Sequence, residues 1–595
     1  MAESSMPSDQ QTLAPQTGGG VSLRGWDLAG VLVALMLTML LAALDQTIVS
    51  TALPKIIQDL NGFDRYTWVV TAYLLAETTV IPILGKLSDQ FGRKWFLVAG
   101  VVIFLLGSML SGTSTTMNQL IIYRGIQGIG AGFLFALIFT LIGDIFTPAE
   151  RARWQGLFSG VFALASVIGP TLGGWISDTT TWRWVFYVNV PLGIVALLLL
   201  IFRLPANISA RSTRFTGMAA VRRIDFAGAI TASAATVCLL LGLTWGGQTY
   251  PWVSPQVIGT LGGGAALFVA FYLIERRAKE PILPLDLFRN RIFTAGAFLS
   301  LLVGVALFAV VIYLPLFIQG VLGQSATNSG VVITPLTLTM AIGSALVGQL
   351  IYKIGRYQFL SIIGAIIMTF GVFLMSQMNT TTGLGEVTRN MIVVGIGLGM
   401  LQPVLTLAVQ NAIPRTRLGV GTSAVTYLRT MGQTLGTAII GTIVNNTITT
   451  QLAINLPANA HRLPPALLSA ATNERALTDP AYRTQVTHIA TQAALKQAIA
   501  AIPPGPQHDQ TVATLLQTVP QQVQNLLNGI FDATRLSLSV GIHNGFIAGV
   551  LACVLVVVAT LFLKDVPLSR TFHQPPAKSG ESQPEEVGEA VPAGH

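Results

Sequence analysis

The sequence predicts an all-α integral membrane protein with fourteen transmembrane helices, arranged as two six-helix halves with two helices inserted between them. Three observations support this prediction: the composition, the length of the uncharged stretches and a repeated loop. Of the 595 residues, 52% are hydrophobic and only 10% are charged, whereas about 25% are charged in a soluble domain. The composition therefore excludes a soluble enzyme, and it also excludes a disordered chain, which needs low hydrophobicity.

Each helix is predicted from a stretch without acidic or basic residues that is long enough to cross a bilayer, which takes about 20 apolar residues. The stretches 226–274 and 292–352 are each long enough for two crossings joined by a turn. The helix centres are expected near residues 38, 77, 104, 131, 165, 194, 235, 265, 306, 340, 367, 400, 432 and 552.

Basic residues alternate between successive loops, and this alternation predicts the orientation. The even-numbered loops carry clusters such as Arg93 with Lys94 and Arg415 with Arg417, whereas the odd-numbered loops carry few basic residues or none. We therefore expect a multi-pass protein of a bacterial plasma membrane with both termini in the cytoplasm. Residues 1–22 are polar and lack the apolar core of a signal peptide, which predicts a disordered cytoplasmic tail.

The loops predict how the chain divides into segments. These are a tail (1–22), an N-terminal half (23–203), a linker (204–223), inserted helices 7 and 8 (224–275), a second linker (276–291), a C-terminal half (292–565) and a disordered cytoplasmic tail (566–595). The C-terminal half includes a long outer loop, 447–538. There Val523, Leu527 and Ile530 recur at helical spacing. We expect an amphipathic helix over 520–536 that feeds helix 14 and rests this face on the outer mouth of the bundle.

One loop sequence occurs twice. Gly85, Leu87, Gly92 and Arg93 lie between helices 2 and 3, and the same residue types recur between helices 10 and 11, at a constant offset of 263 residues. A shared loop eight helices apart indicates two related halves. Duplicated halves around a site near the bilayer midplane are typical of transporters.

Several motifs resemble those of the major facilitator superfamily, in particular its fourteen-helix drug:proton antiporters. The segment Gly85–Lys94 resembles the cytoplasmic signature of the family, and Leu44–Pro54 is similar to its first-helix motif. Further motif residues are Arg124, Gln127, Gly128 and Gly130 on helix 4, and Gly160, Gly169, Pro170, Gly173 and Gly174 on helix 5. The stretch Trp182–Gly193 is also similar to the family. The resemblance runs from about residue 25 to residue 565. It implies the major facilitator fold and proton-coupled antiport by alternating access.

Four charged residues fall inside predicted helices: Asp45, Glu77, Arg124 and Arg429. A charge within a bilayer is costly and marks a candidate functional residue. Asp45 and Glu77 are expected roughly 13 Å, and Arg124 roughly 10 Å, below the outer face. We expect these three to face a common cavity and to carry proton coupling, because a carboxyl balanced between burial and a nearby cation can load and release a proton.

Alternatives remain open for these charges. A static salt bridge that only fixes helix packing would produce the same pattern for Asp45, Arg124 and Glu77, and for Glu77 this explanation is as good as proton coupling. A site for a cationic substrate is a further interpretation of Glu77. Arg429 is expected to serve packing or to pair with an anion rather than to carry protons.

The motif glycines and charges between helices 2 and 3 predict a gate. Asp89 is expected to latch a helix end or to partner Arg93 and Lys94 while the transporter faces outward, with Gly85 and Gly92 allowing close helix approach. An ordinary basic loop that sets topology is the alternative. The helix-5 motif is expected to kink its helix and to form a seal between the halves that prevents proton leakage. Simple packing of small residues is the alternative. The motif residues are Gly160, Gly169, Pro170, Gly173 and Gly174.

The substrate wall is predicted from polar and aromatic residues in the central helices. The candidates are Gln127, Phe308, Tyr313, Phe317, Gln402 and Gln410. The sequence has no phosphate-binding glycine loop, which argues against ATP as energy source, and no cluster typical of a metal site. No cofactor other than the proton gradient is expected, and no nucleic acid partner.

The sequence thus predicts a proton-coupled exporter of hydrophobic or cationic small molecules that works in contact with membrane lipid, and not an enzyme. The same fold exporting an endogenous lipid or hydrophobic metabolite is the first alternative. A membrane-embedded enzyme is the remote one, because no nucleophile–base pair or metal-ligand set is visible.

Overall fold

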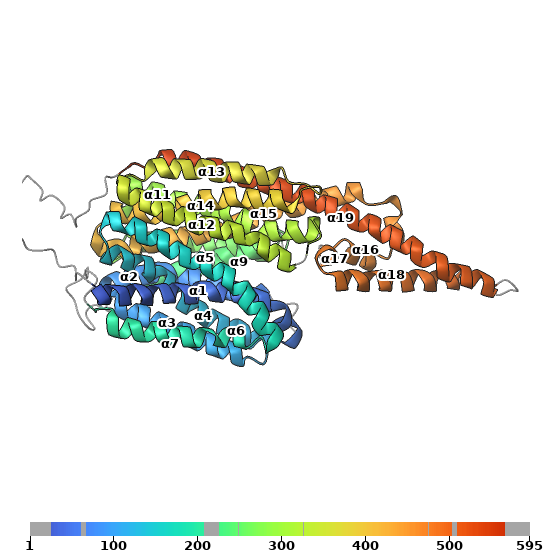
Figure 1. The fold of residues 1–595 in the computed structure, drawn as a ribbon, viewed down its shortest axis with the longest axis horizontal. Helices are drawn as coiled ribbons and strands as arrows, with labels where there is room; N and C mark the ends of the chain where they lie inside the picture. The colour runs from blue at the N-terminus through green and yellow to red at the C-terminus, as the bar shows by residue number, and fades with distance from the viewer. Residues whose placement is uncertain are drawn as a thin grey trace, which may run out of the picture.

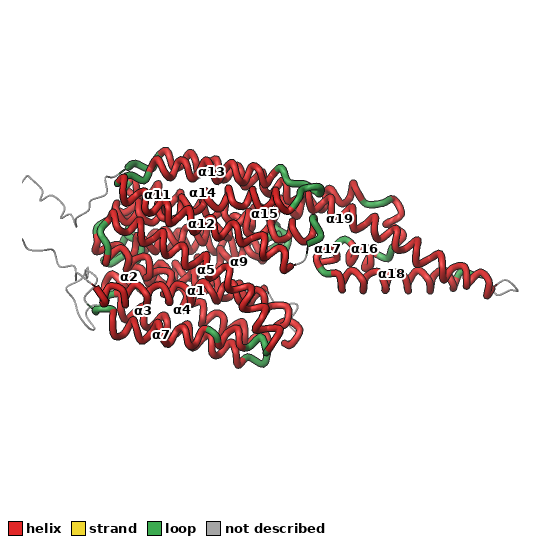
Figure 2. The backbone as a smooth tube through the Cα atoms, in the orientation of Figure 1, coloured by secondary structure: helices red, strands yellow, loops and turns green. Residues whose placement is uncertain are grey.

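The computed structural model describes residues 25–60, 67–206, 225–247, 249–324, 326–473, 475–502 and 508–565. Within these ranges the chain is helical and forms no strand (Figure 2). The expected tails at 1–22 and 566–595, and most of the expected linker at 204–223, lie outside the described residues.

The long helices match all fourteen predicted centres. The N-terminal half contains α1 (Gly25–Leu60), α2 (Thr67–Phe91), α3 (Arg93–Thr113), α4 (Met117–Ile145), α5 (Pro148–Thr179), α6 (Trp184–Tyr187) and α7 (Asn189–Arg203). The inserted pair is α9 (Phe226–Trp245) and α10 (Pro255–Glu275). The C-terminal half contains α11 (Arg291–Leu316), α12 (Ala326–Ile354), α13 (Gln358–Ser376), α14 (Leu384–Ala412), α15 (Leu418–Asn455) and α19 (His508–Leu561).

By length and composition, 12 helices of the described residues can each span a membrane, with α6 and α7 forming one span. The other two predicted crossings correspond to α11 and to α15, which carries many threonines and Arg429. The fold is therefore the predicted all-α membrane bundle.

Local sequence signals set where several helices begin. The Glu150 carboxylate accepts a 3.0 Å hydrogen bond from the backbone N–H of Thr147, and Pro148 starts α5. The Asp225 side chain accepts from the N–H of Gly228 at the start of α9. Such side chains satisfy N–H groups that have no partner within the helix.

The two halves lie side by side, and each has its own apolar core (Figure 1). They meet mainly through two helix pairs, α2 with α15 and α5 with α12. The first glycine of each copy of the repeat lies at one of these contacts. A Cβ on Gly85 would lie 2.5 Å from Ser423 Oγ, and a Cβ on Gly348 would collide with the carbonyl oxygen of Ala152. The repeat therefore marks two equivalent close approaches between the halves.

The inserted helices α9 and α10 pack on each other beside this interface. α9 contacts both α2 and α15, whereas α10 is mostly exposed on the outside of the bundle. Both ends of the described chain, at the start of α1 and the end of α19, lie at one end of the bundle (Figure 1). Arg93 at the start of α3 and Arg415 just before α15 both bind Asp144 at this end of α4. We call this end the basic end.

A helical extension projects from the opposite end of the bundle (Figure 1). It follows α15 and consists of η5 (Ala458–Arg462), α16 (Pro465–Ala471), α17 (Arg475–Thr478), α18 (Pro480–Ala500) and the first part of α19. Asp479 starts α18, and hydrogen bonds from the N–H groups of Tyr482 and Ala481 and from Arg475 hold the pKa of its carboxyl below the ordinary value.

The structure corrects the prediction for this loop. The expected helix over 520–536 exists, but it is part of the continuous α19 of 54 residues. Its apolar face, with Val523, Leu527 and Ile530, packs on the helices of the loop itself and not on the mouth of the bundle. Short helices such as α16 and α17 are marginal in water without an apolar partner, and this face of α19 is that partner.

Candidate functional site

A buried ion pair lies inside the N-terminal half. Arg124 on α4 donates a 2.6 Å hydrogen bond from Nη1 to Oδ2 of Asp45 on α1. Asp45 is 0% exposed and Arg124 is 2% exposed. The structure thus brings together two of the three residues predicted for proton coupling.

Amide side chains complete the surroundings of the Asp45 carboxylate. Its Oδ1 accepts hydrogen bonds from Gln127 Nε2 at 2.8 Å and from Asn189 Nδ2 at 2.9 Å. Asn189 also donates to Ser108 Oγ at 3.1 Å. Gln127 was expected in the substrate wall, but it is fully buried and bonded to both Asp45 and Arg124. It belongs to the ionic cluster instead.

Aromatic rings cover the guanidinium of Arg124. The ring of Tyr73 on α2 lies 4.2 Å from it and that of Phe186 on α6 lies 5.9 Å from it. Arg124 Nε also donates to the carbonyl oxygen of Val69. Cation–π contacts are stronger where water is excluded, so the arginine is held in one position from α1, α2 and α6.

Glu77 lies near this cluster but outside the ion pair. Its Oε2 accepts a 3.2 Å hydrogen bond from Gln46 Nε2, and its side chain is 6% exposed. Arg429 on α15 and Arg124 both lie within electrostatic range of its carboxylate. Arg429 itself donates a 2.8 Å hydrogen bond to Oε1 of Gln402 on α14.

At the basic end, Asp89 joins the two halves. Its carboxylate accepts hydrogen bonds from the N–H groups of Gly419 at 2.9 Å and Val420 at 3.0 Å, at the first turn of α15. It also accepts a 2.8 Å hydrogen bond from Arg93. A helix N-terminus attracts a negative charge, and the expected contact of Asp89 with a helix end is present.

The other residues of the Gly85–Lys94 motif support this contact. Arg93 is 0% exposed and also pairs with Asp144 on α4 at 2.8 Å. Lys94 donates to the carbonyl oxygen of Ile201 near the C-terminal end of α7, where a cation is favourable. Gly92 has a φ of 92° between α2 and α3, a conformation that favours glycine.

Of the two interpretations of the helix-5 motif, its contacts fit packing and not a seal between the halves. A Cβ on Gly173 would lie 2.6 Å from the carbonyl oxygen of Ile48, and a Cβ on Gly169 would collide with Thr47, both on α1. Around Gly160 and Gly174 no atom lies within 4 Å of such a Cβ. Two of the four glycines thus seat α5 on α1 within one half rather than sealing the two halves. Pro170 lies inside the continuous α5.

The contact between α5 and the other half uses different residues. A Cβ on Gly156 of α5 would lie 2.5 Å from the carbonyl oxygen of Ser344 on α12. Gln155 donates a 3.0 Å hydrogen bond to Gln410 on α14, which in turn donates to the carbonyl oxygen of Phe139. Gln410 was expected to line the substrate cavity, but it is buried as a connection between the halves.

Two of the three aromatic residues predicted for the substrate wall lie elsewhere. Tyr313 and Phe317 are 8% and 1% exposed and pack inside the apolar core of the C-terminal half. Phe308 lies in α11, and its side chain is outside the described set. Among the candidates with described side chains, Gln402, which is partly exposed beside Arg429, keeps a position that suits a polar ligand.

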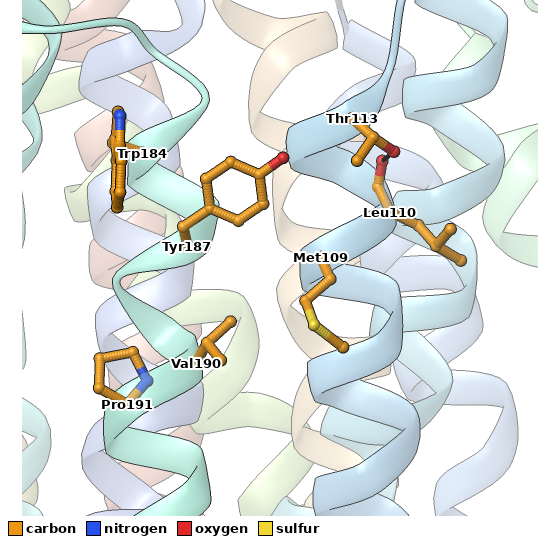
Figure 3. A pocket seen from close by; sticks show the side chains of 7 residues that line it. All are labelled: Met109, Leu110, Thr113, Trp184, Tyr187, Val190 and Pro191. Carbon is orange, nitrogen blue, oxygen red and sulfur yellow. Dashed lines mark hydrogen bonds between the residues drawn. The ribbon is translucent and has the colours of Figure 1, made fainter.

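An apolar groove opens on the side of the bundle, between α3 and the α6–α7 segment (Figure 3). Its volume is about 520 Å³, and Met109, Leu110, Trp184, Tyr187 and Pro191 are among the side chains that line it. Figure 3 shows Tyr187 directed from its helix toward Thr113 across the groove. The groove is separate from the charged cluster, and it was not predicted.

Comparison with known proteins identifies the fold. A model of the Major Facilitator Superfamily matches residues 35–437. The chain belongs to the major facilitator superfamily. It is therefore a multi-pass membrane transporter and not an enzyme, as its sequence predicts.

Two relatives within the superfamily come from Bacillus subtilis. The chain is 36% identical over 540 residues to the multidrug transporter protein MdtP, covering 91% of this chain and 93% of that protein. It is 40% identical over 423 residues to multidrug resistance protein 3, covering 71% and 80%.

Solved structures of superfamily members share the fold. The proton:xylose symporter XylE matches with a TM-score of 0.52 and 16% identity, covering 71% of this chain and 89% of that one. The human organic anion transporter MFSD10 matches with a TM-score of 0.52 and 15% identity, covering 71% and 95%.

Sequence reasoning missed several residues of the site. Asn189 stands in the motif-like stretch after Trp182, but an uncharged amide gives no charge signal. Ser108 and Tyr73 look like ordinary helix residues, and Asp144 lies at a helix end where a carboxylate is common. Among the described residues, no group of His, Cys, Asp and Glu could hold a metal ion.

Proposed function

We propose that this transporter exports hydrophobic or cationic drugs in exchange for protons. The main support is a buried cluster in which Arg124, Gln127 and Asn189 surround the carboxylate of Asp45 and keep it from water. The names of the Bacillus subtilis relatives support drugs as substrates.

The chemistry of the cluster supports proton coupling. In the conformation described here, Arg124 and two amides stabilise the ionised form of Asp45. A movement that loosens these contacts leaves a buried carboxylate without its cation, and such a group takes up a proton. Re-forming the contacts expels the proton. Protonation is thus tied to the arrangement of α1, α4 and α7.

The contacts between the halves support alternating access. At the basic end, Asp89 binds the start of α15 and Gln410 bridges α4, α5 and α14. We propose that the basic end faces the cytoplasm of a bacterium and is closed in this conformation. Opening of the basic end requires these hydrogen bonds to break, so that the two halves move apart where α2 meets α15.

The proposal is tested with purified protein in proteoliposomes and an imposed pH gradient. The wild type should accumulate a panel of cationic and neutral dyes against their gradient. Asp45→Asn should abolish uphill transport and keep the fold, because an amide can accept from Gln127 and Asn189 but cannot cycle a proton. Asp27→Asn, an exposed carboxylate on the same helix, is the matched control and should transport normally.

Uphill transport by Asp45→Asn with an unchanged response to pH would refute the coupling role. Transport of a lipid by the wild type, with no transport of any dye, would favour the export of an endogenous hydrophobic compound instead.

A further inference from the structure

Glu77 and Arg429 lie at the same depth on two helices that face each other across the halves. α2 and α15 are antiparallel neighbours, and Gly85 meets α15 between Gly419 and Ser423. Glu77 lies 85 − 77 = 8 residues from Gly85 toward the extension. Arg429 lies 429 − 421 = 8 residues beyond the middle of that contact. Both charges are therefore about 12 Å further along the helices than the glycine contact.

The two charges are close enough to interact but are not bonded to each other. Their electrostatic interaction is mutual. Within the described part of the chain, neither forms an ion pair within 4.0 Å. Each instead holds a neutral amide of its own half, Gln46 for Glu77 and Gln402 for Arg429.

Neighbouring charges do not satisfy this pair. Asp45 and Arg124 neutralise each other directly at 2.6 Å, and two amides complete the surroundings of Asp45. This leaves one carboxylate and one guanidinium facing each other across the interface without direct contact. Isolated charges inside a membrane protein are costly, and a group placed between them would gain from both.

Arg429 is accessible enough to bind such a group. Its side chain is partly exposed, although it lies 429 − 418 = 11 residues from the start of α15, which is about 16 Å. Only one of its five N–H donors has a hydrogen bond in the described structure. A guanidinium with free donors suits a carboxylate, which it binds through two parallel hydrogen bonds.

We propose that Glu77 and Arg429 form a bipolar substrate site across the two halves that takes amphoteric small molecules carrying a cationic nitrogen and a carboxylate. This inference rests on the proposed export function and names a substrate class for it. Glu77 holds the cationic end and Arg429 holds the carboxylate. A bound molecule of this kind contacts both halves at once, whereas a simple cation contacts only the N-terminal half.

Three dyes of one scaffold test the site. Rhodamine 110 carries a cation and a carboxylate, its methyl ester rhodamine 123 carries the cation alone, and fluorescein is anionic. Binding to the purified protein is measured by fluorescence anisotropy, and transport is measured in proteoliposomes with a pH gradient. The wild type should bind and transport rhodamine 110 at least as well as rhodamine 123.

The variants separate the two ends of the site. Arg429→Gln should weaken binding of rhodamine 110 at least tenfold and leave rhodamine 123 within twofold, and Arg429→Lys should recover part of the loss. Glu77→Gln should weaken binding of both rhodamines and not that of fluorescein. Arg389→Gln, which removes an exposed arginine of α14, should change neither.

Two outcomes would overturn the inference while leaving export intact. In the first, Arg429→Gln loses affinity for rhodamine 110 and for rhodamine 123 to the same extent. In the second, the wild type transports rhodamine 123 but neither binds nor transports rhodamine 110. Failure of the wild type to move any dye on a pH gradient would instead refute the proposed function, and the substrate class with it. If Arg429→Gln does not fold, the ratio of the two rhodamine affinities in Arg429→Lys decides between the same outcomes.

Discussion

Asp89 accepts a 2.9 Å hydrogen bond from the backbone N–H of Gly419, a residue 330 positions later in the chain. The bond fixes the end of α2 to the first turn of α15 and so joins the two halves at the basic end. Both partners are buried, and a Cβ on Gly419 would lie 2.5 Å from Oδ1 of Asp89 and 2.5 Å from the carbonyl oxygen of Gly85. Position 419 therefore requires glycine for this contact.

Gly419→Ala should shift the protein away from the closed basic end, because the added methyl group displaces the Asp89 carboxylate. We expect a cysteine placed at the buried Ser423, in a background without Cys238 and Cys553, to react about tenfold faster with a maleimide. Gly263→Ala, where no atom lies within 4 Å of the new Cβ, serves as control. Equal labelling rates in the two variants would show that this contact does not keep the end closed.

Gly173→Ala and Gly174→Ala should behave differently, although the two residues are adjacent. The first variant forces Cβ against the backbone of α1 and should cost about 1–3 kcal/mol of stability through overpacking. The second adds a methyl group in open space and should stay within about 0.5 kcal/mol, because alanine favours a helix.

Thermal unfolding of the two variants in detergent measures this difference. A dye trapped in liposomes that reports pH shows in addition whether Gly173→Ala leaks protons. Similar stability of both variants would mean that α1 and α5 are less closely packed than the structure indicates.

Asn189→Ala should weaken proton coupling without unfolding the protein. It removes a hydrogen bond to the ionised Asp45, and hydrogen bonds to charged groups contribute about 1.5–3 kcal/mol. We expect at least a tenfold loss of proton-driven transport and a pH profile that differs from that of the wild type, because the Asp45 carboxylate loses a hydrogen-bond donor. Ser111→Ala, a buried serine that bonds only within its own helix, is the control. A wild-type pH profile in Asn189→Ala would exclude Asn189 from the coupling cluster.

Leu527→Ala should unfold the helical extension locally. Leu527 is 1% exposed within the core that it forms with η5 and α16–α18, and deletion of such a side chain costs about 2–5 kcal/mol. Hydrogen exchange in α17 and α18 should accelerate while α1–α5 keep their protection. Leu516→Ala, at a leucine that is 52% exposed, should leave the exchange pattern unchanged. Unchanged protection of α18 in Leu527→Ala would argue against a shared core.

The sequence by itself determined the membrane helices and the charges inside them. Stretches long enough to span a bilayer admit only helices, because backbone groups in lipid must be paired within the segment. The fixed rise per residue of these helices put Asp45 and Arg124 at similar predicted depths on α1 and α4, and the family motifs implied the major facilitator fold.

Only the tertiary structure decided which helix faces meet. Gln127 and Gln410 both looked like cavity residues, yet one supports Asp45 and the other bridges the halves. The face with Leu527 was correctly predicted as apolar, but its partner came from α18 rather than from the bundle. A helical pattern shows that a residue needs a partner and leaves open which one, because the partner depends on the rotation and distance of helices that are far apart in the chain. An amide such as Asn189 is still harder to recognise from the sequence as a functional residue, because it carries no charge that would stand out within an apolar helix.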